Sequence, residues 1–194
     1  MMDIFLSASV PLPERDRKFF KTADVLAIRE AIKALVEVVL PQGTITCGGH
    51  PAITPLLALF VREAGLEAER VTIFQSAMFS DQLPKELSAF VDVRTVPAIG
   101  QQRNENLTAM RKEMIASREF AAAVFIGGME GVLEELDLFG RVHPKARVLP
   151  LASTGAAAAL IYKQGDFDKQ FAYNMAYPSL FRRKLLLNDA RSKR

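Results

Sequence analysis

The chain has 194 residues, of which 49% are hydrophobic and 24% charged, and its formal net charge is only +3. This composition fits one globular domain over residues 1–194, because no linker, low-complexity tract or repeat divides it. The basic excess lies at the C-terminus, in Arg182, Arg183, Lys184, Arg191, Lys193 and Arg194. A short basic terminus is more often a solvated tail than a nucleic-acid site, so nucleic-acid binding is not expected.

The single cysteine, Cys47, excludes an internal disulfide and a cysteine-rich metal site, and it indicates a reducing compartment. The two histidines lie far apart without a spaced acidic partner, so neither a metal nor another cofactor is expected. The apolar N-terminus MMDIFLSASVPLP lacks a basic region, and no run reaches the roughly 18 apolar residues that a membrane helix needs. We therefore expect a cytoplasmic protein with no membrane partner.

Short apolar runs alternate with segments of helical period along the chain, which predicts strands at 4–8, 44–47, 71–75, 90–95, 121–126 and 147–151. A helix capped by Asp24 follows the first strand, a more apolar helix spans 51–64, and a charged, surface-facing helix spans 105–118. This order is typical of a Rossmann-like, doubly wound α/β domain. We expect a mostly parallel sheet of about six or seven strands with helices on both faces.

Ligands of such sheets bind beyond the carboxyl ends of the strands, near the point where the strand order reverses. Five of the six predicted strands end in glycine or small polar residues, which favours a phosphate or nucleotide cleft at that edge. The candidate ligand-binding residues at these ends are Ser7, Ser9, Gly48, Gly49, His50, Gln75, Ser76, Gly127, Gly128, Ser153, Thr154 and Gly155.

The glycine pair lies in AAAVFIGGMEGVLEEL, residues 121–136, between a buried strand and an acidic helix. Glycine lets backbone N–H groups approach a ligand closely, and a helix that begins near Glu130 points its partly positive end at the same place. Met129, Glu130 and Gly131 therefore join the candidate binding residues. The alternative is a tight strand-to-helix connection without a ligand.

The segment MRKEMIASREFAAAVFIGGMEGVLEE resembles the signature of the lysine-decarboxylase-like proteins, which include the LONELY GUY cytokinin-activating phosphoribohydrolases. That signature is an Arg-Lys pair followed by a strand ending in GGxGTxxE. The resemblance implies that Arg111 and Glu134 would be the catalytic pair of a hydrolase. However, Glu130 replaces the third glycine, Gly131 the threonine and Ile126 the usual proline, which argues against unchanged phosphoribohydrolase activity.

Together with SASVP, GGHPAITPL, FQS and LASTGAAAAL, the whole chain is similar to the SLOG superfamily (named for Smf/DprA and LOG). Within it, the chain resembles the branch that accompanies TIR domains in bacterial anti-phage systems. The resemblance implies a Rossmann-like fold and a nucleotide-derived ligand of the NAD or ADP-ribose type. It also implies a homo-oligomer and a TIR-type or other effector as partner, and it leaves the choice between sensor and enzyme open.

Each candidate side chain has a role and an alternative. Arg111 would hold a phosphate through its planar donors, or it is a solvated charge on a polar helix. His50 would stack on a base or donate to a phosphate, and Glu130 or Ser9 would read ribose hydroxyls. Glu134 and its neighbour Glu135 also favour the helix dipole, so a purely structural role competes.

The remaining polar groups have simpler interpretations. Ser153 and Thr154 precede a helix, and capping alone explains them. His143 precedes a proline in a loop and is interpreted as structural. Cys47 has no obvious base and no serine lies in a GxSxG turn, so nucleophilic catalysis is not expected.

Three functions follow from these residues. The first is a module that binds and senses a nucleotide-derived ligand. The alternative is a nucleoside 5′-monophosphate phosphoribohydrolase, in which Arg111 holds the substrate and Glu134 supports the ribosyl centre as the base departs. The third is an interaction domain that uses the amphipathic segment YPSLFRRKLLL, which could pack on this chain or on a partner.

Overall fold

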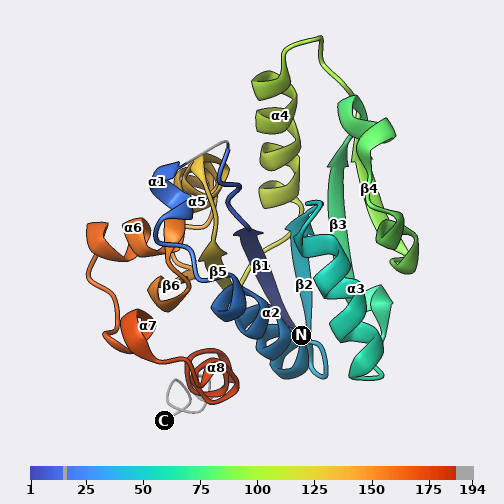
Figure 1. Cartoon of the computed structure of the whole chain (residues 1–194). Coiled ribbons are helices and arrows are strands. Elements are labelled where there is room, and N and C mark those ends of the chain that lie inside the picture. Colours follow the sequence, from blue (N-terminus) through green and yellow to red (C-terminus); the bar gives the residue numbers. More distant parts are fainter. Residues whose placement is uncertain (15–16, 187–194) are drawn as a thin grey trace.

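The structure is a computed structural model that describes residues 1–14 and 17–186 (Figure 1). The strands are β1 (Met2–Ser9), β2 (Gly43–Gly48), β3 (Val71–Ser76), β4 (Asp92–Val96), β5 (Ala122–Gly127) and β6 (Arg147–Leu151). All six predicted strands are confirmed, with ends within a residue or two of those expected. Long apolar runs form these strands because both faces of the sheet are covered.

The six strands form one sheet in the order β4-β3-β2-β1-β5-β6, and every neighbouring pair is parallel. The predicted Rossmann-like α/β fold is therefore confirmed. The chain winds outward from β1 to β4 and then returns to the other side of β1 with β5. The strand order thus reverses between β1 and β5, where a ligand crevice is expected.

Helices cover both faces of the sheet (Figure 1). The longer helices are α2 (Val25–Val39), α3 (Ile53–Glu63), α4 (Arg103–Ala116), α5 (Glu130–Val142) and α6 (Ala156–Gln164). The short helices are α1 (Arg17–Phe20), α7 (Gln170–Tyr173) and α8 (Tyr177–Phe181). The described residues also contain the 3-10 segments η1 (Ala68–Arg70), η2 (Ala77–Gln82), η3 (Lys85–Ala89) and η4 (Ala152–Thr154) and the π-helix η5 (Arg182–Leu186).

Side-chain alternation along the strands divides the core into two layers. Ile4 and Leu6 of β1 pack into the layer that contains α2, α3 and α8, whereas Phe5 packs into the layer that contains α4, α5 and α6. Asp24 caps α2 as predicted, because its carboxylate accepts a hydrogen bond from Ala27 N–H (2.9 Å).

Helix α4 is less exposed than its charged sequence suggested, since Asn106, Met110, Met114 and Ile115 are buried. It extends beyond the carboxyl ends of β1 and β2 (Figure 1). The C-terminal half of α4 therefore belongs to the core. Its N-terminal half extends past the carboxyl edge of the sheet (Figure 1).

The C-terminal amphipathic segment packs on its own chain. Tyr177, Leu180, Phe181 and Leu185 are buried, and α8 lies against α2. Of the basic C-terminal residues, Arg191, Lys193 and Arg194 lie outside the described residues. Within residues 1–14 and 17–186, no helix has the length and apolar character needed to cross a bilayer.

Candidate functional site

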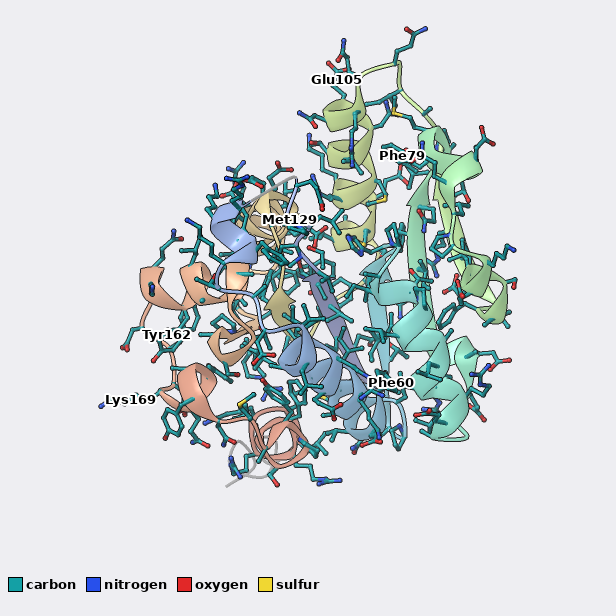
Figure 2. All side chains as sticks on the ribbon, viewed as in Figure 1. Phe60, Phe79, Glu105, Met129, Tyr162 and Lys169 are labelled. Atoms are coloured by element: carbon teal, nitrogen blue, oxygen red, sulfur yellow. The ribbon has the colours of Figure 1, made fainter. Side chains whose placement is uncertain are left out.

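A cleft of about 650 Å³ lies beyond the carboxyl ends of β1, β2 and β3, between these ends and helices α4 and α5. It is next to the point where the strand order reverses. Met129 and Phe79, both labelled in Figure 2, lie on its α5 side and its β3 side. The predicted site residues that line it are Ser9, Gly48, Gly49, His50, Gln75, Arg111, Met129, Glu130, Gly131 and Glu134.

The floor of the cleft holds an ion cluster that links α4, α5 and β1, which we call the floor cluster: Ser7, Arg111, Glu134 and Glu135. The Arg111 guanidinium contacts the Glu134 carboxylate through Nη1, and its Nε lies 3.4 Å from Glu135 Oε1. Ser7 Oγ donates to Glu135 Oε2 at 2.5 Å. Arg111 is therefore shared between two carboxylates rather than solvated.

The two carboxylates differ in depth. The side chain of Glu135 is 13% exposed, whereas that of Glu134 is 55% exposed. Burial raises the pKa of Glu135, and the Arg111 guanidinium and the Ser7 hydroxyl oppose that rise. The sequence assigned Glu134 to the cleft, and the structure adds Glu135 as the inner carboxylate.

Gly131 makes the position of Arg111 possible. A Cβ at this residue would lie 2.5 Å from Arg111 Nη2, so any larger side chain would displace the guanidinium. Gly131 and the two glutamates lie three and four residues apart on α5 and so share one helix face. The glycine that replaces the motif's threonine thus provides the space in which Arg111 meets both carboxylates.

The glycine pair serves the fold and does not line the cleft. Gly127 and Gly128 have φ values of +58° and +94°, a region that side chains disfavour. The N–H of Gly127 donates to Thr154 Oγ1 (2.8 Å), and that of Gly128 donates to Ser9 O (2.8 Å). Both donors that a phosphate would use are engaged within the protein.

The turn after β6 also lies away from the cleft lining, because β6 is at the outer edge of the sheet. Thr154 is buried and closes the glycine turn, and its hydroxyl donates to Leu151 O (2.6 Å). Ser153 Oγ pairs with Tyr177 Oη (3.0 Å). Gly155 is needed because a Cβ there would overlap the carbonyl of Thr22.

The ends of β2 and β3 form the opposite side of the cleft. His50 Nδ1 accepts from Ala52 N–H (3.1 Å), and His50 N–H donates to Thr54 Oγ1 (3.0 Å), which fixes the first turn before α3. Gln75 is 5% exposed and packs on Gly49, where a Cβ would overlap its amide. Ser76 lies outside the lining and caps η2 through Met78 N–H (3.3 Å).

The start of α5 brings a second ion pair to the cleft mouth. Glu130 pairs with Lys18 Nζ at 2.8 Å, and both side chains are more than half exposed. The N-terminal end of α5 begins at this residue and adds a partly positive dipole end. Anionic and cationic groups therefore lie together at this end of the cleft.

Part of the lining was not predicted from the sequence. We call it the apolar lobe: Phe79, Leu83, Pro84, Leu107 and Met110. The first three belong to the connection after β3, and the last two belong to α4. Arg103 covers the Phe79 ring, with its guanidinium carbon 5.5 Å from the ring centroid. An aromatic side chain four residues beyond Gln75 was the only available indication.

Two further groups are structural in this environment. His143 is buried against Phe120 and Phe139, and its Nε2 lies 2.8 Å from Ile115 O. Cys47 lines the cleft from β2 but is 2% exposed, and burial raises its pKa to about 12. Among the described residues, no group of three or more His, Cys, Asp or Glu side chains could hold a metal ion.

These features define a Rossmann-like α/β domain with a charged and apolar cleft at the carboxyl edge of its sheet. The model of the SLOG cluster3 family matches residues 18–185, and the chain belongs to this family. The predicted SLOG superfamily is thus confirmed, and membership implies binding of nucleotide-derived ligands in general. The resemblance to the TIR-associated branch is finer than this match and stays a prediction.

The fold is similar to that of TM1055, a target of the Northeast Structural Genomics Consortium whose X-ray structure is known. The TM-score is 0.58 at 14% sequence identity, and the match covers 95% of this chain and 100% of that chain. At this identity the likeness shows a shared fold alone. No curated protein matches the sequence.

Proposed function

We propose that this SLOG domain binds and senses a nucleotide-derived molecule of the NAD or ADP-ribose type in the cleft beyond the strand ends. The observation that carries the proposal is that one cleft joins the apolar lobe to the floor cluster. A nucleotide has the same two parts, an apolar base and a polar ribose phosphate. The volume of about 650 Å³ lies within the range of small-molecule and cofactor sites.

The charges of the cleft favour a ligand with hydroxyl donors as well as phosphates. Arg111 is already paired with Glu134 and Glu135, so the floor offers carboxylate acceptors that ribose hydroxyls can satisfy. Phosphates would lie toward the start of α5 at the cleft mouth. A ribose over the floor cluster would then join the two ends of the ligand.

The sensing part of the proposal depends on the resemblance to TIR-associated SLOG domains. A ligand that binds one state of an oligomer more tightly shifts the population toward that state. We propose a homo-oligomer whose state, when the ligand binds, controls a TIR-type or other effector in a bacterial anti-phage system. Ligand-induced change of oligomeric state, followed by light scattering, tests this part.

A second candidate function is hydrolysis of the N-glycosidic bond of a nucleoside 5′-monophosphate. The observation that favours it is the contact between Arg111 and Glu134, the two residues that the hydrolase signature pairs. Glu135, whose pKa is raised by burial, adds a second carboxyl group beside this pair. The engaged N–H groups of Gly127 and Gly128 favour binding over this alternative.

The two functions are separated by measuring binding and base release on the same samples. The protein is titrated calorimetrically with NAD, ADP-ribose and AMP, and free nicotinamide or adenine is followed by chromatography. Binding without base release supports the sensor. Base release that Glu134→Gln abolishes while binding persists supports the hydrolase and contradicts the sensor.

A matched control is Glu113→Gln on α4, because Glu113 is exposed and lies outside the cleft lining. This variant should bind as the wild type does. If none of the three ligands binds to the wild-type protein at millimolar concentration, the proposed function is wrong.

A further inference from the structure

Gln75 is a buried amide that the fold does not satisfy. Its side chain lines the cleft, the residue is 5% exposed, and Nε2 is buried without a hydrogen-bond partner among the described residues. Most buried polar side-chain atoms in proteins have such a partner, and a donor left without one destabilises the fold. An unsatisfied amide at a cleft therefore indicates a contact that a ligand completes.

The surroundings hold this amide in place without using its hydrogen bonds. Gln75 packs on Gly49, and only glycine leaves room for it there. Met110 Cε packs against the neighbouring Gly48, 3.6 Å from the position that a Cβ would occupy. The two glycines thus lie between Gln75 and Met110 of the apolar lobe. Nε2 is buried in this structure, and a half-turn about the last torsion of Gln75, which exchanges Oε1 and Nε2, would turn it toward a ligand.

The apolar lobe next to Gln75 suits a planar ring. Phe79 offers an aromatic face, and Arg103 over that ring adds a planar cation. Aromatic and guanidinium planes stack on bases of any sequence, whereas an amide distinguishes them by its donor and acceptor. An amide of this kind complements the edge of adenine, where an amino group lies next to an acceptor nitrogen.

We propose that Gln75 reads the amino-bearing edge of an adenine base that stacks on Phe79 in the apolar lobe. This inference rests on the proposed function and deepens it, because it assigns the base and its orientation. The ribose then lies toward the floor cluster, and the phosphates lie toward α5. Gln75 is a specificity residue and takes no part in any bond-breaking step.

The test couples a change in the protein to a change in the ligand. Wild type and Gln75→Leu are titrated with AMP, with the purine ribonucleoside monophosphate that lacks the 6-amino group, and with ribose 5-phosphate. We expect wild type to prefer AMP over the analogue without the amino group by roughly 5- to 150-fold, the range of a good amide–base pair. In Gln75→Leu this preference should disappear, while the affinity for ribose 5-phosphate stays unchanged.

A second measurement does not depend on any ligand. Leucine has a similar volume and removes the unsatisfied amide, so ligand-free Gln75→Leu should melt about 2–4 °C above wild type. The matched control is Gln164→Leu at the exposed end of α6, which should leave both melting and binding unchanged.

The outcomes separate this inference from the proposed function. If Gln75→Leu weakens all three ligands equally, or melts below wild type, Gln75 is structural and the inference is wrong while the proposed function stands. If wild type binds AMP and its analogue equally, the base is not read here. Failure of wild type to bind any adenine nucleotide overturns the proposed function, and this inference falls with it.

Discussion

Removing Arg111 should destabilise the protein mainly by leaving Glu135 buried without a counter-charge. The side chains of Arg111 and Glu135 are 11% and 13% exposed, so both lie almost entirely out of water. Breaking a buried pair by removing one partner costs about 3–5 kcal/mol. Because each side chain keeps some contact with water, we expect Arg111→Met to lower the free energy of unfolding by about 3 kcal/mol. The melting temperature should fall by about 6–12 °C.

The double variant Arg111→Met/Glu135→Gln identifies the cause. A neutral glutamine needs no counter-charge and can still accept from Ser7, so the second substitution should restore about 2 kcal/mol of the loss. Lys112→Met is the matched control, because Lys112 is exposed on the same helix. It should change the free energy of unfolding by less than about 0.5 kcal/mol.

The pH dependence of the stability loss in Arg111→Met provides an independent test of this cause. Without the guanidinium, the pKa of Glu135 should rise further above its ordinary value, since burial then acts unopposed. The folded state would hold a proton that the unfolded state releases, so stability should be full at acid pH and fall as the pH rises. Arg111→Met should therefore lose more stability relative to wild type at pH 7 than at pH 5.

Urea unfolding followed by circular dichroism at both pH values measures these quantities. The reasoning would be refuted by a double variant no more stable than Arg111→Met. It would be refuted equally by a stability loss independent of pH, because an unpaired buried carboxylate predicts both effects.

Three further predictions concern the glycine turn and the cysteine. Thr154→Val should lower the free energy of unfolding by about 1–3 kcal/mol, because it leaves the Gly127 N–H unpaired; equal stability of Thr154→Val and Thr154→Ser in urea would contradict this. Gly127→Ala should cost at least about 1 kcal/mol, since φ is +58° and its Cβ would lie 2.5 Å from Ile28 Cδ1; wild-type melting would refute it. Cys47, with a pKa of about 12, should react with Ellman's reagent only after unfolding, and rapid labelling of the native protein would show otherwise.

The sequence predicted the strands well because parallel strands covered on both faces must be apolar along their length. The Val71–Ser76 strand is buried at every position, and the Ala122–Gly127 strand is too. The cap at Asp24 was also predicted correctly, because a cap depends on residues three or four positions apart in the sequence. Features set within a few residues of the chain could be derived without knowing the neighbours.

The lateral order of the strands could not be predicted in this way. All the candidate turns were expected to meet at one edge, yet the cleft extends over the ends of β1, β2 and β3 and does not include the turn after β6. The position of β6 follows from which strand it pairs with, and no residue in the turn encodes that. Thr154 therefore completes the turn at Gly127, and Ser153 pairs with Tyr177.

The sequence also could not predict which of the two glutamate side chains, Glu134 or Glu135, is buried. Adjacent residues on a helix point about 100° apart, so the packing of α4 against α5 decides which carboxylate faces inward. Arg111 reaches both, and Ser7 fixes Glu135. Only the arrangement of three separate elements gives this result.

The altered motif explains the acidity of the floor. A threonine at position 131 would place its Cβ 2.5 Å from Arg111 Nη2 and would push the guanidinium away from α5. With Gly131 the guanidinium of Arg111 stays close to α5 and contacts both carboxylates. Its positive charge is therefore neutralised by groups of the protein itself. The donors that a phosphate cradle needs are likewise engaged at Gly127 and Gly128. A ligand must therefore bring hydroxyl donors to the floor and place its phosphates elsewhere, which favours recognition of a ribose over tight capture of a monophosphate for cleavage.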